Sequence, residues 1–149
     1  MKFLVLNRSP KGKYSITLQT VRYLKRKYPE HEFAVLHAGQ RIKALEKDFT
    51  EAKELLDTCD AVIFAYPVWA SSITPPIRSF VSENKDALGG KEIGAVATYM
   101  GSGAQKSIKK LEKLLDVEIK PQLILTDLDE KKEENEQLAA DFIRQLSDD

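Results

Sequence analysis

The sequence is poor in cysteine and histidine, with one cysteine and two histidines in 149 residues. The lone Cys59 excludes an internal disulfide and a cysteine-rich metal or iron–sulfur cluster. Because Cys59 directly precedes an apolar run, we expect it to be a buried structural thiol. His31 and His37 lie around one predicted strand, and we expect a surface or core role for both. The sequence therefore predicts no metal site.

Long apolar runs are also missing. No stretch approaches the ~18 consecutive apolar residues that a membrane-spanning helix needs. The first residues enter a strand pattern without the features of a signal peptide. We therefore expect a cytoplasmic protein that has no membrane partner.

An excess of charge of one sign is absent, because 23 Lys and Arg balance 23 Asp and Glu. This balance argues against nucleic acid as a partner of the whole molecule. The charges are nevertheless unevenly distributed. Residues 1–29 hold eight basic residues and no acid, whereas the segment from Asp127 onward holds nine acids and three bases.

What the sequence does contain is a regular alternation of two patterns. Near-continuous apolar runs are typical of parallel strands that are buried on both faces. They occupy residues 2–7, 60–67, 92–100 and 121–128, with 32–38 as a slightly more polar fifth candidate. Helical spacing of apolar residues lies between and after them, at 17–28, 52–59, 77–88, 104–115 and 138–146. The alternation predicts one doubly wound α/β domain that spans residues 1–149.

In such a sheet, ligands bind beyond the carboxyl ends of the strands. The loop after the first strand, "RSPKGKY", leads into Ser15, a good helix N-cap. Helix N-termini favour phosphate groups, and this segment adds the hydroxyls of Ser9, Ser15 and Thr17 and the charge of Lys11. By itself the loop fits a phosphate site and a capped helix with a solvated basic loop equally well. No Walker sequence spans it.

Two further loops are unusual. Trp69, the only tryptophan, follows the third predicted strand in "YPVWASSITPPIRSF" and either offers a stacking surface or covers the next helix. The loop after the fourth strand, "TYMGSG", contains Tyr99 and two glycines, Gly101 and Gly103, that permit close approach of a ligand to the backbone. A phosphate cradle, two aromatic rings and a glycine-lined wall at one sheet edge suit a flat aromatic ligand with one phosphate. Flavin mononucleotide (FMN) fits that description.

The assembled motifs resemble the flavodoxin-like superfamily, most closely its NAD(P)H-dependent FMN reductase and quinone reductase branch. The resemblance covers essentially the whole chain and rests on "NRSPKGKYSIT", "PVWASSITPP" and, more weakly, "TYMGSG". It implies a five-stranded parallel sheet in the order 2-1-3-4-5 with helices on both faces. Three residues depart from the family pattern: Arg8, Lys11 and Ile16. Lys11 keeps the positive charge without the forked geometry of arginine, and Ile16 offers only its backbone N–H.

By position, the resemblance assigns cofactor-binding roles to three groups of residues. The groups are Ser9, Lys11, Ser15, Ile16 and Thr17 around the FMN phosphate, Pro67, Val68, Trp69 and Ala70 beside the ribityl chain and ring, and Thr98, Tyr99, Gly101, Ser102 and Gly103 at the pyrimidine edge. The implied reaction passes hydride from NADH or NADPH to FMN and then electrons to a quinone, flavin or similar small acceptor. Since the cofactor supplies the chemistry, no catalytic residue is predicted. The family also implies a homodimer.

Two alternatives remain open from the sequence. The first is a flavodoxin-type electron carrier that binds FMN without its own nicotinamide-dependent turnover, although such carriers are usually acidic around the flavin. The second is a non-catalytic module whose basic first helix contacts an anionic partner, although such a cluster is more often a solvated face. A phosphoacceptor receiver domain is excluded, because Asn7–Arg8 and Tyr66–Pro67 stand where it needs acids.

Overall fold

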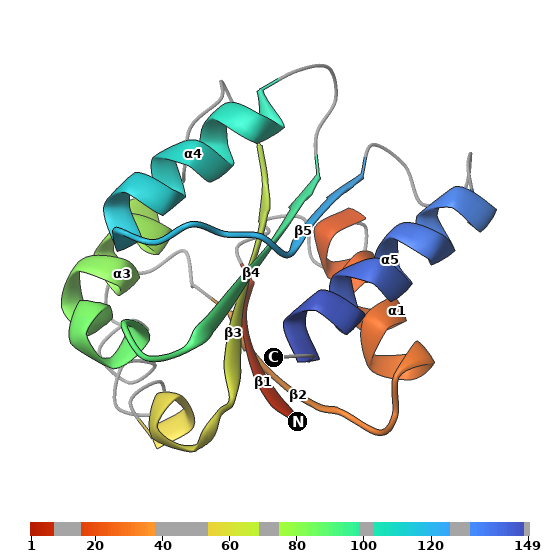
Figure 1. The fold of residues 1–149 in the computed structure, drawn as a ribbon, viewed down its shortest axis with the longest axis horizontal. Coiled ribbons are helices and arrows are strands. Elements are labelled where there is room, and N and C mark those ends of the chain that lie inside the picture. Colours follow the sequence, from red (N-terminus) through yellow and green to blue (C-terminus); the bar gives the residue numbers. More distant parts are fainter. Residues whose placement is uncertain (8–15, 38–53, 69–74, 99–102, 126–131, 148–149) are drawn as a thin grey trace.

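The computed structural model describes residues 1–7, 16–37, 54–68, 75–98, 103–125 and 132–147. Within these ranges a single five-stranded sheet forms the centre of the molecule (Figure 1). All its strand pairs are parallel, and the order is β2-β1-β3-β4-β5, as predicted. The strands are β1 (Lys2–Asn7), β2 (Glu32–His37), β3 (Ala61–Pro67), β4 (Glu92–Thr98) and β5 (Gln122–Leu125).

Helices cover both faces of this sheet. Figure 1 shows α1 (Ile16–Lys27) and α5 (Lys132–Ser147) on one face and α3 (Pro75–Leu88) and α4 (Ala104–Leu115) on the other. A short helical segment at residues 54–58 precedes β3. The crossovers from strand to helix to parallel strand place the starts of α1, α3 and α4 beside the carboxyl ends of β1, β3 and β4.

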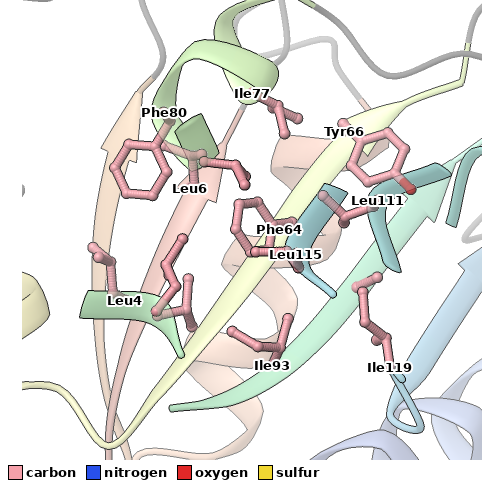
Figure 2. Packing of buried hydrophobic residues seen from close by; sticks show 14 of the residues in the cluster. Leu4, Leu6, Phe64, Tyr66, Ile77, Phe80, Ile93, Leu111, Leu115 and Ile119 are labelled. Atoms are coloured by element: carbon pink, nitrogen blue, oxygen red, sulfur yellow. The ribbon is translucent and has the colours of Figure 1, made fainter. Parts of the chain in front are cut away.

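The apolar strand patterns arise because neighbouring residues face opposite sides of the sheet and both sides are buried. In β1, Leu4 and Leu6 belong to the core on the α3 and α4 face, whereas Phe3 and Val5 belong to the core on the α1 and α5 face. Figure 2 shows part of the first core, in which Phe80 of α3 meets Phe64 of β3 edge to face. Both surfaces of the sheet are therefore committed to packing, and ligand contacts have to come from its edge.

Helix boundaries follow local sequence signals. α3 begins at Pro75, as expected for proline in a first helical turn, and α1 ends at Lys27, two residues before Pro29. The expected core role of Cys59 is confirmed, because it is 4% exposed and its thiol contacts the carbonyl of Leu56. His31 packs against the ring of Phe3 at the amino ends of the strands, whereas the side chain of His37 lies outside the described residues.

The last helix differs from its prediction. The apolar spacing predicts a helix at 138–146, but α5 spans Lys132–Ser147. Its first turns are polar and carry Asn135 on the buried side, so apolar periodicity does not reveal them. Leu138 was expected on the packed face but is 41% exposed, while Ala139, Phe142, Ile143 and Leu146 are buried as expected.

Candidate functional site

The carboxyl ends of β1, β3 and β4 form the edge on which the three motif-bearing loops start. Asn7, the last residue of β1, is opposite Ala65 of β3, and Pro67 at the end of β3 is opposite Thr98 at the end of β4. Asn7 is buried, and Pro67 and Val68 are half-buried. The topology thus brings the three segments to one edge of the sheet.

Thr17 and Thr98 meet at this edge. The Oγ1 atoms of the two residues lie 2.6 Å apart, which is a short hydrogen bond between hydroxyls. Thr17 is the second residue of α1 and Thr98 is the last residue of β4, and they are 1% and 5% exposed. The backbone N–H of Val68 donates to the carbonyl of Thr98 at 2.8 Å. The residue at the end of β4 is therefore bonded both to the start of α1 and to the residue that follows β3.

A second pair of hydroxyls lies at the same edge on the opposite face of the sheet. The hydroxyl of Tyr66, which is 0% exposed, lies 3.1 Å from Oγ of Ser107, and this Oγ also donates to the carbonyl of Ala104 at 2.7 Å. Burial raises the pKa of the Tyr66 phenol, and the hydrogen bond to Ser107 opposes part of that rise. Figure 2 shows the Tyr66 ring within the core beside Leu111. This pair fastens the first turn of α4 to β3.

Gly103 sits at the junction between β4 and α4. It is the N-cap residue of α4 and has a φ of 107°, a left-handed conformation that side chains other than glycine rarely adopt. No side chain among the described residues caps this helix. The glycine predicted from "TYMGSG" is therefore required by the backbone where the chain turns into α4.

The helix starts at this edge lack acidic residues. The first turns of α1, α3 and α4 contain none, whereas that of α5 contains Glu133 and Glu134. A helix N-terminus carries partial positive charge and backbone N–H groups without helical partners. Acids in the first turn commonly balance that charge, so helix starts without them fit an anionic ligand. Because α3 begins with Pro75 and Pro76, which have no backbone N–H, the free donors are chiefly those of α1 and α4. These donors suit a phosphate group such as that of FMN.

The predicted site residues divide into two groups. The described ones lie at the carboxyl edge: the backbone of Ile16, together with Thr17, Pro67, Val68, Thr98 and Gly103. The others lie outside the described residues: Ser9, Lys11, Ser15, Trp69, Ala70, Tyr99, Gly101 and Ser102. Contact with FMN stays a prediction for both groups.

Sequence reasoning missed Asn7, Tyr66 and Ser107, which are buried polar residues at or beside this edge. The available signal was a polar residue at the end of an otherwise apolar strand, as with Asn7. No comparable signal distinguished Tyr66 or Ser107, because each lies within an ordinary strand or helix pattern.

Other features of the described residues lie elsewhere or are absent. A shallow surface concavity of about 680 Å³ surrounds the end of α4, and exposed charged side chains such as Lys113 and Glu118 line much of it. It is at the opposite end of α4 from Gly103, so it is separate from the candidate site. The described parts of the chain contain no group of three or more His, Cys, Asp or Glu side chains suited to a metal ion. None of the described helices has the length and apolar character that crossing a bilayer requires.

Comparison with known proteins identifies the family of the sequence. The sequence matches the family model for NADPH-dependent FMN reductases over residues 1–127. A comparison with curated proteins gives no match.

Several solved structures share the fold. An NADH:FMN oxidoreductase in its apo form has a TM-score of 0.76 at 17% identity, with 99% of this chain and 91% of that chain covered. The flavoenzyme NAD(P)H:(acceptor) oxidoreductase FerB from Paracoccus denitrificans has a TM-score of 0.70 at 15% identity, covering 97% and 94% of the two chains. A flavoprotein from Lactobacillus acidophilus in complex with FMN has a TM-score of 0.57 at 12% identity, covering 91% and 98%. At these identities the likeness shows the fold alone.

Proposed function

Because this chain belongs to the NADPH-dependent FMN reductase family, we propose that it binds FMN at the carboxyl edge of its sheet and passes electrons to a quinone, a free flavin or a similar small acceptor. Family membership confirms the general activity expected from the sequence, that of an FMN-dependent oxidoreductase using NADH or NADPH. The acceptor and the residues that hold FMN are the proposed parts.

The observation that carries the proposed site is the set of helix starts without acids. The helices α1, α3 and α4 begin at this edge with no carboxylate in their first turns. We assign the phosphate to the start of α1, with Ile16 contributing its backbone N–H and with Ser9, Lys11, Ser15 and Thr17 around it. We assign the ribityl chain and ring to Pro67, Val68, Trp69 and Ala70, and the pyrimidine edge to Thr98, Tyr99, Gly101, Ser102 and Gly103.

FMN, when bound, supplies the ring that accepts hydride and releases electrons, so no side chain has to act as an acid or a base. The role of the chain is to bind FMN and to orient it. Backbone N–H groups at the start of α1 hold negative charge, and Gly103 allows the backbone to come close to a ligand where a side chain would not fit. Pro67 and Val68 present half-buried apolar surface that excludes water from one side of the site.

A visible absorption spectrum tests the proposal. The protein is recorded alone, with added FMN, and then with NADH or NADPH in the absence of oxygen. We expect the spectrum of bound flavin, and we expect NADH or NADPH to bleach it. The colour should return when a quinone or free flavin is added. A protein that remains colourless after incubation with FMN refutes the site. A flavin spectrum that neither nicotinamide bleaches favours the electron-carrier alternative, against which family membership otherwise argues.

We further propose that the protein is a homodimer in the cytoplasm. The support is analogy, because reductases of this family commonly pair their subunits so that a neighbour helps to close the flavin site. Analytical ultracentrifugation of the FMN-loaded protein at micromolar concentration tests the assembly. A monomer at the highest measurable concentration contradicts it.

A further inference from the structure

Thr98 is bonded to segments that follow two other strands. Its side chain bonds to Thr17 at the start of α1, and its carbonyl accepts from Val68 after β3. Thr98 also begins the segment that leads to Gly103. One residue therefore fixes the spacing between the parts of the chain to which the phosphate and the flavin ring are assigned.

We propose that Thr98 is a positioning residue that couples the phosphate-binding and ring-binding ends of the FMN site through its hydrogen bond to Thr17. The inference rests on the proposed function. FMN carries the phosphate and the ring in one molecule, so its affinity depends on how well the spacing of the two subsites is fixed beforehand. Riboflavin has the ring without the phosphate, and its affinity is insensitive to that spacing.

The geometry favours a fixed spacing. Both hydroxyls are almost wholly buried, so breaking their bond leaves polar atoms without water to replace the lost partner. The bond joins residues 81 positions apart in the sequence. Because Thr17 lies in the first turn of α1, a shift of Thr98 is passed directly to the backbone N–H groups at that helix start.

The test measures dissociation constants for FMN and riboflavin by quenching of flavin fluorescence. The ratio of the riboflavin constant to the FMN constant reports how much the phosphate contributes. Thr98→Val removes the hydroxyl and keeps the shape of the side chain. We expect it to lower this ratio about tenfold, the equivalent of one buried hydrogen bond, with little change in riboflavin affinity. Thr98→Ser keeps the hydroxyl and restores the ratio.

Thr98→Ala is the second variant if Thr98→Val does not fold. Thr17→Val breaks the same bond from the other side, but it also removes a hydroxyl that is assigned to the phosphate, so it is interpreted only in combination with Thr98→Val. If Thr98 acts through its bond to Thr17, the double variant lowers the ratio no further than Thr17→Val alone. A double variant whose loss equals the product of the two single losses overturns the inference, because the residues then act independently.

Tyr66→Phe is the matched control. It breaks the other buried hydroxyl pair at this edge, on the opposite face of the sheet, and leaves Ser107 bonded to the carbonyl of Ala104. We expect lower thermal stability and an unchanged ratio. A ratio that falls as far in Tyr66→Phe as in Thr98→Val overturns the inference, since general loosening then explains both.

The remaining outcomes separate this inference from the function on which it rests. A wild-type protein that does not bind FMN refutes the proposed function and this inference together. A wild-type protein that binds FMN while Thr98→Val leaves the ratio unchanged overturns the inference alone. Equal weakening of riboflavin and FMN in Thr98→Val also overturns it, because the Thr98 hydroxyl then contacts the ring directly, whereas the inference leaves the pyrimidine-edge contact of Thr98 to its backbone.

Discussion

Gly94 in the middle of β4 provides a quantitative test of how α5 packs on the sheet. A methyl group at Gly94 would lie 3.0 Å from both Cε2 and Cζ of Phe142 and 3.4 Å from Cδ1 of Leu146. Favourable carbon contacts lie at about 3.5–4.0 Å, so the Phe142 ring has to move back by a few tenths of an ångström. Phe142 and Leu146 are 1% and 0% exposed, and their movement disturbs a close-packed core.

We therefore expect Gly94→Ala to destabilise the protein. Overpacking a core costs about 1–3 kcal/mol, and replacing glycine recovers about 0.4–1 kcal/mol by restricting the unfolded chain. The net loss in free energy of unfolding is therefore about 0–2.6 kcal/mol, with a central value of about 1.3 kcal/mol. For a domain of this size each kcal/mol shifts Tm by about 2–4 °C, so the central value lowers Tm by roughly 3–5 °C. Urea and thermal unfolding of the FMN-free protein, followed by circular dichroism, give both quantities.

Two further variants make the test specific. Gly90→Ala is the control, because a methyl group there has no atom within 4 Å and we expect little change or a small gain. Phe142→Leu shortens the side chain that obstructs the methyl group, so Gly94→Ala should cost less in that background by about 0.5–1 kcal/mol. A Gly94→Ala protein that is more stable than the wild type, or a cost that Phe142→Leu does not reduce, refutes the packing account.

Other expectations concern pH, a helix end and a surface ion pair. Burial raises the pKa of the Cys59 thiol and the Tyr66 phenol above their ordinary values of 9.0 and 10.0, so the unfolded chain loses these protons first as the pH rises. Stability should therefore be full below about pH 9 and decline above it, and Cys59→Ala should flatten the start of that decline in urea unfolding at increasing pH. Asp116 ends α4 in a left-handed conformation with a φ of 57°, where glycine fits better and a negative charge is unfavourable. Asp116→Gly should raise the free energy of unfolding by about 0.5–1 kcal/mol, measured by urea unfolding, and a loss of stability would contradict this. The pair formed by Arg144 and Asp141 is solvent-exposed at 3.1 Å, so Arg144→Ala should change stability by less than about 0.5 kcal/mol, and a larger loss in thermal unfolding would show that this account of the pair is wrong.

The strands of the sheet were predictable because each one carries its own signal in a short stretch of sequence. Residues such as Phe3 and Leu4 face opposite cores, and burial on both faces produces an uninterrupted apolar run that the sequence displays directly. The order of the strands came from the family resemblance. The early turns of α5 were missed because their residues face solvent or, like Asn135, bury a polar side chain, and neither leaves an apolar period.

The candidate site was predictable only at the level of segments. Parallel topology brings the loops after β1, β3 and β4 to one edge, so their convergence follows from the fold. The bond between Thr17 and Thr98 does not follow from the sequence, because it depends on the exact position at which α1 packs along the sheet. The same holds for Tyr66 and Ser107, which are 41 residues apart. Hydrogen bonds between side chains that are far apart in the sequence become visible only in the three-dimensional structure.

The position of β5 at the outer edge of the sheet has a consequence for the emerging chain on the ribosome. The outer neighbour of β4 is β5, and among the described residues the atoms nearest to a methyl group at Gly94 belong to Phe142 and Leu146 of α5. About fifty residues separate the end of β4 from the end of α5, and at about 5–20 residues per second their synthesis takes roughly 3–10 s. During that interval the nascent chain exposes an unpaired strand edge beside an apolar face, which is the kind of surface that chaperones bind and that aggregates when they do not.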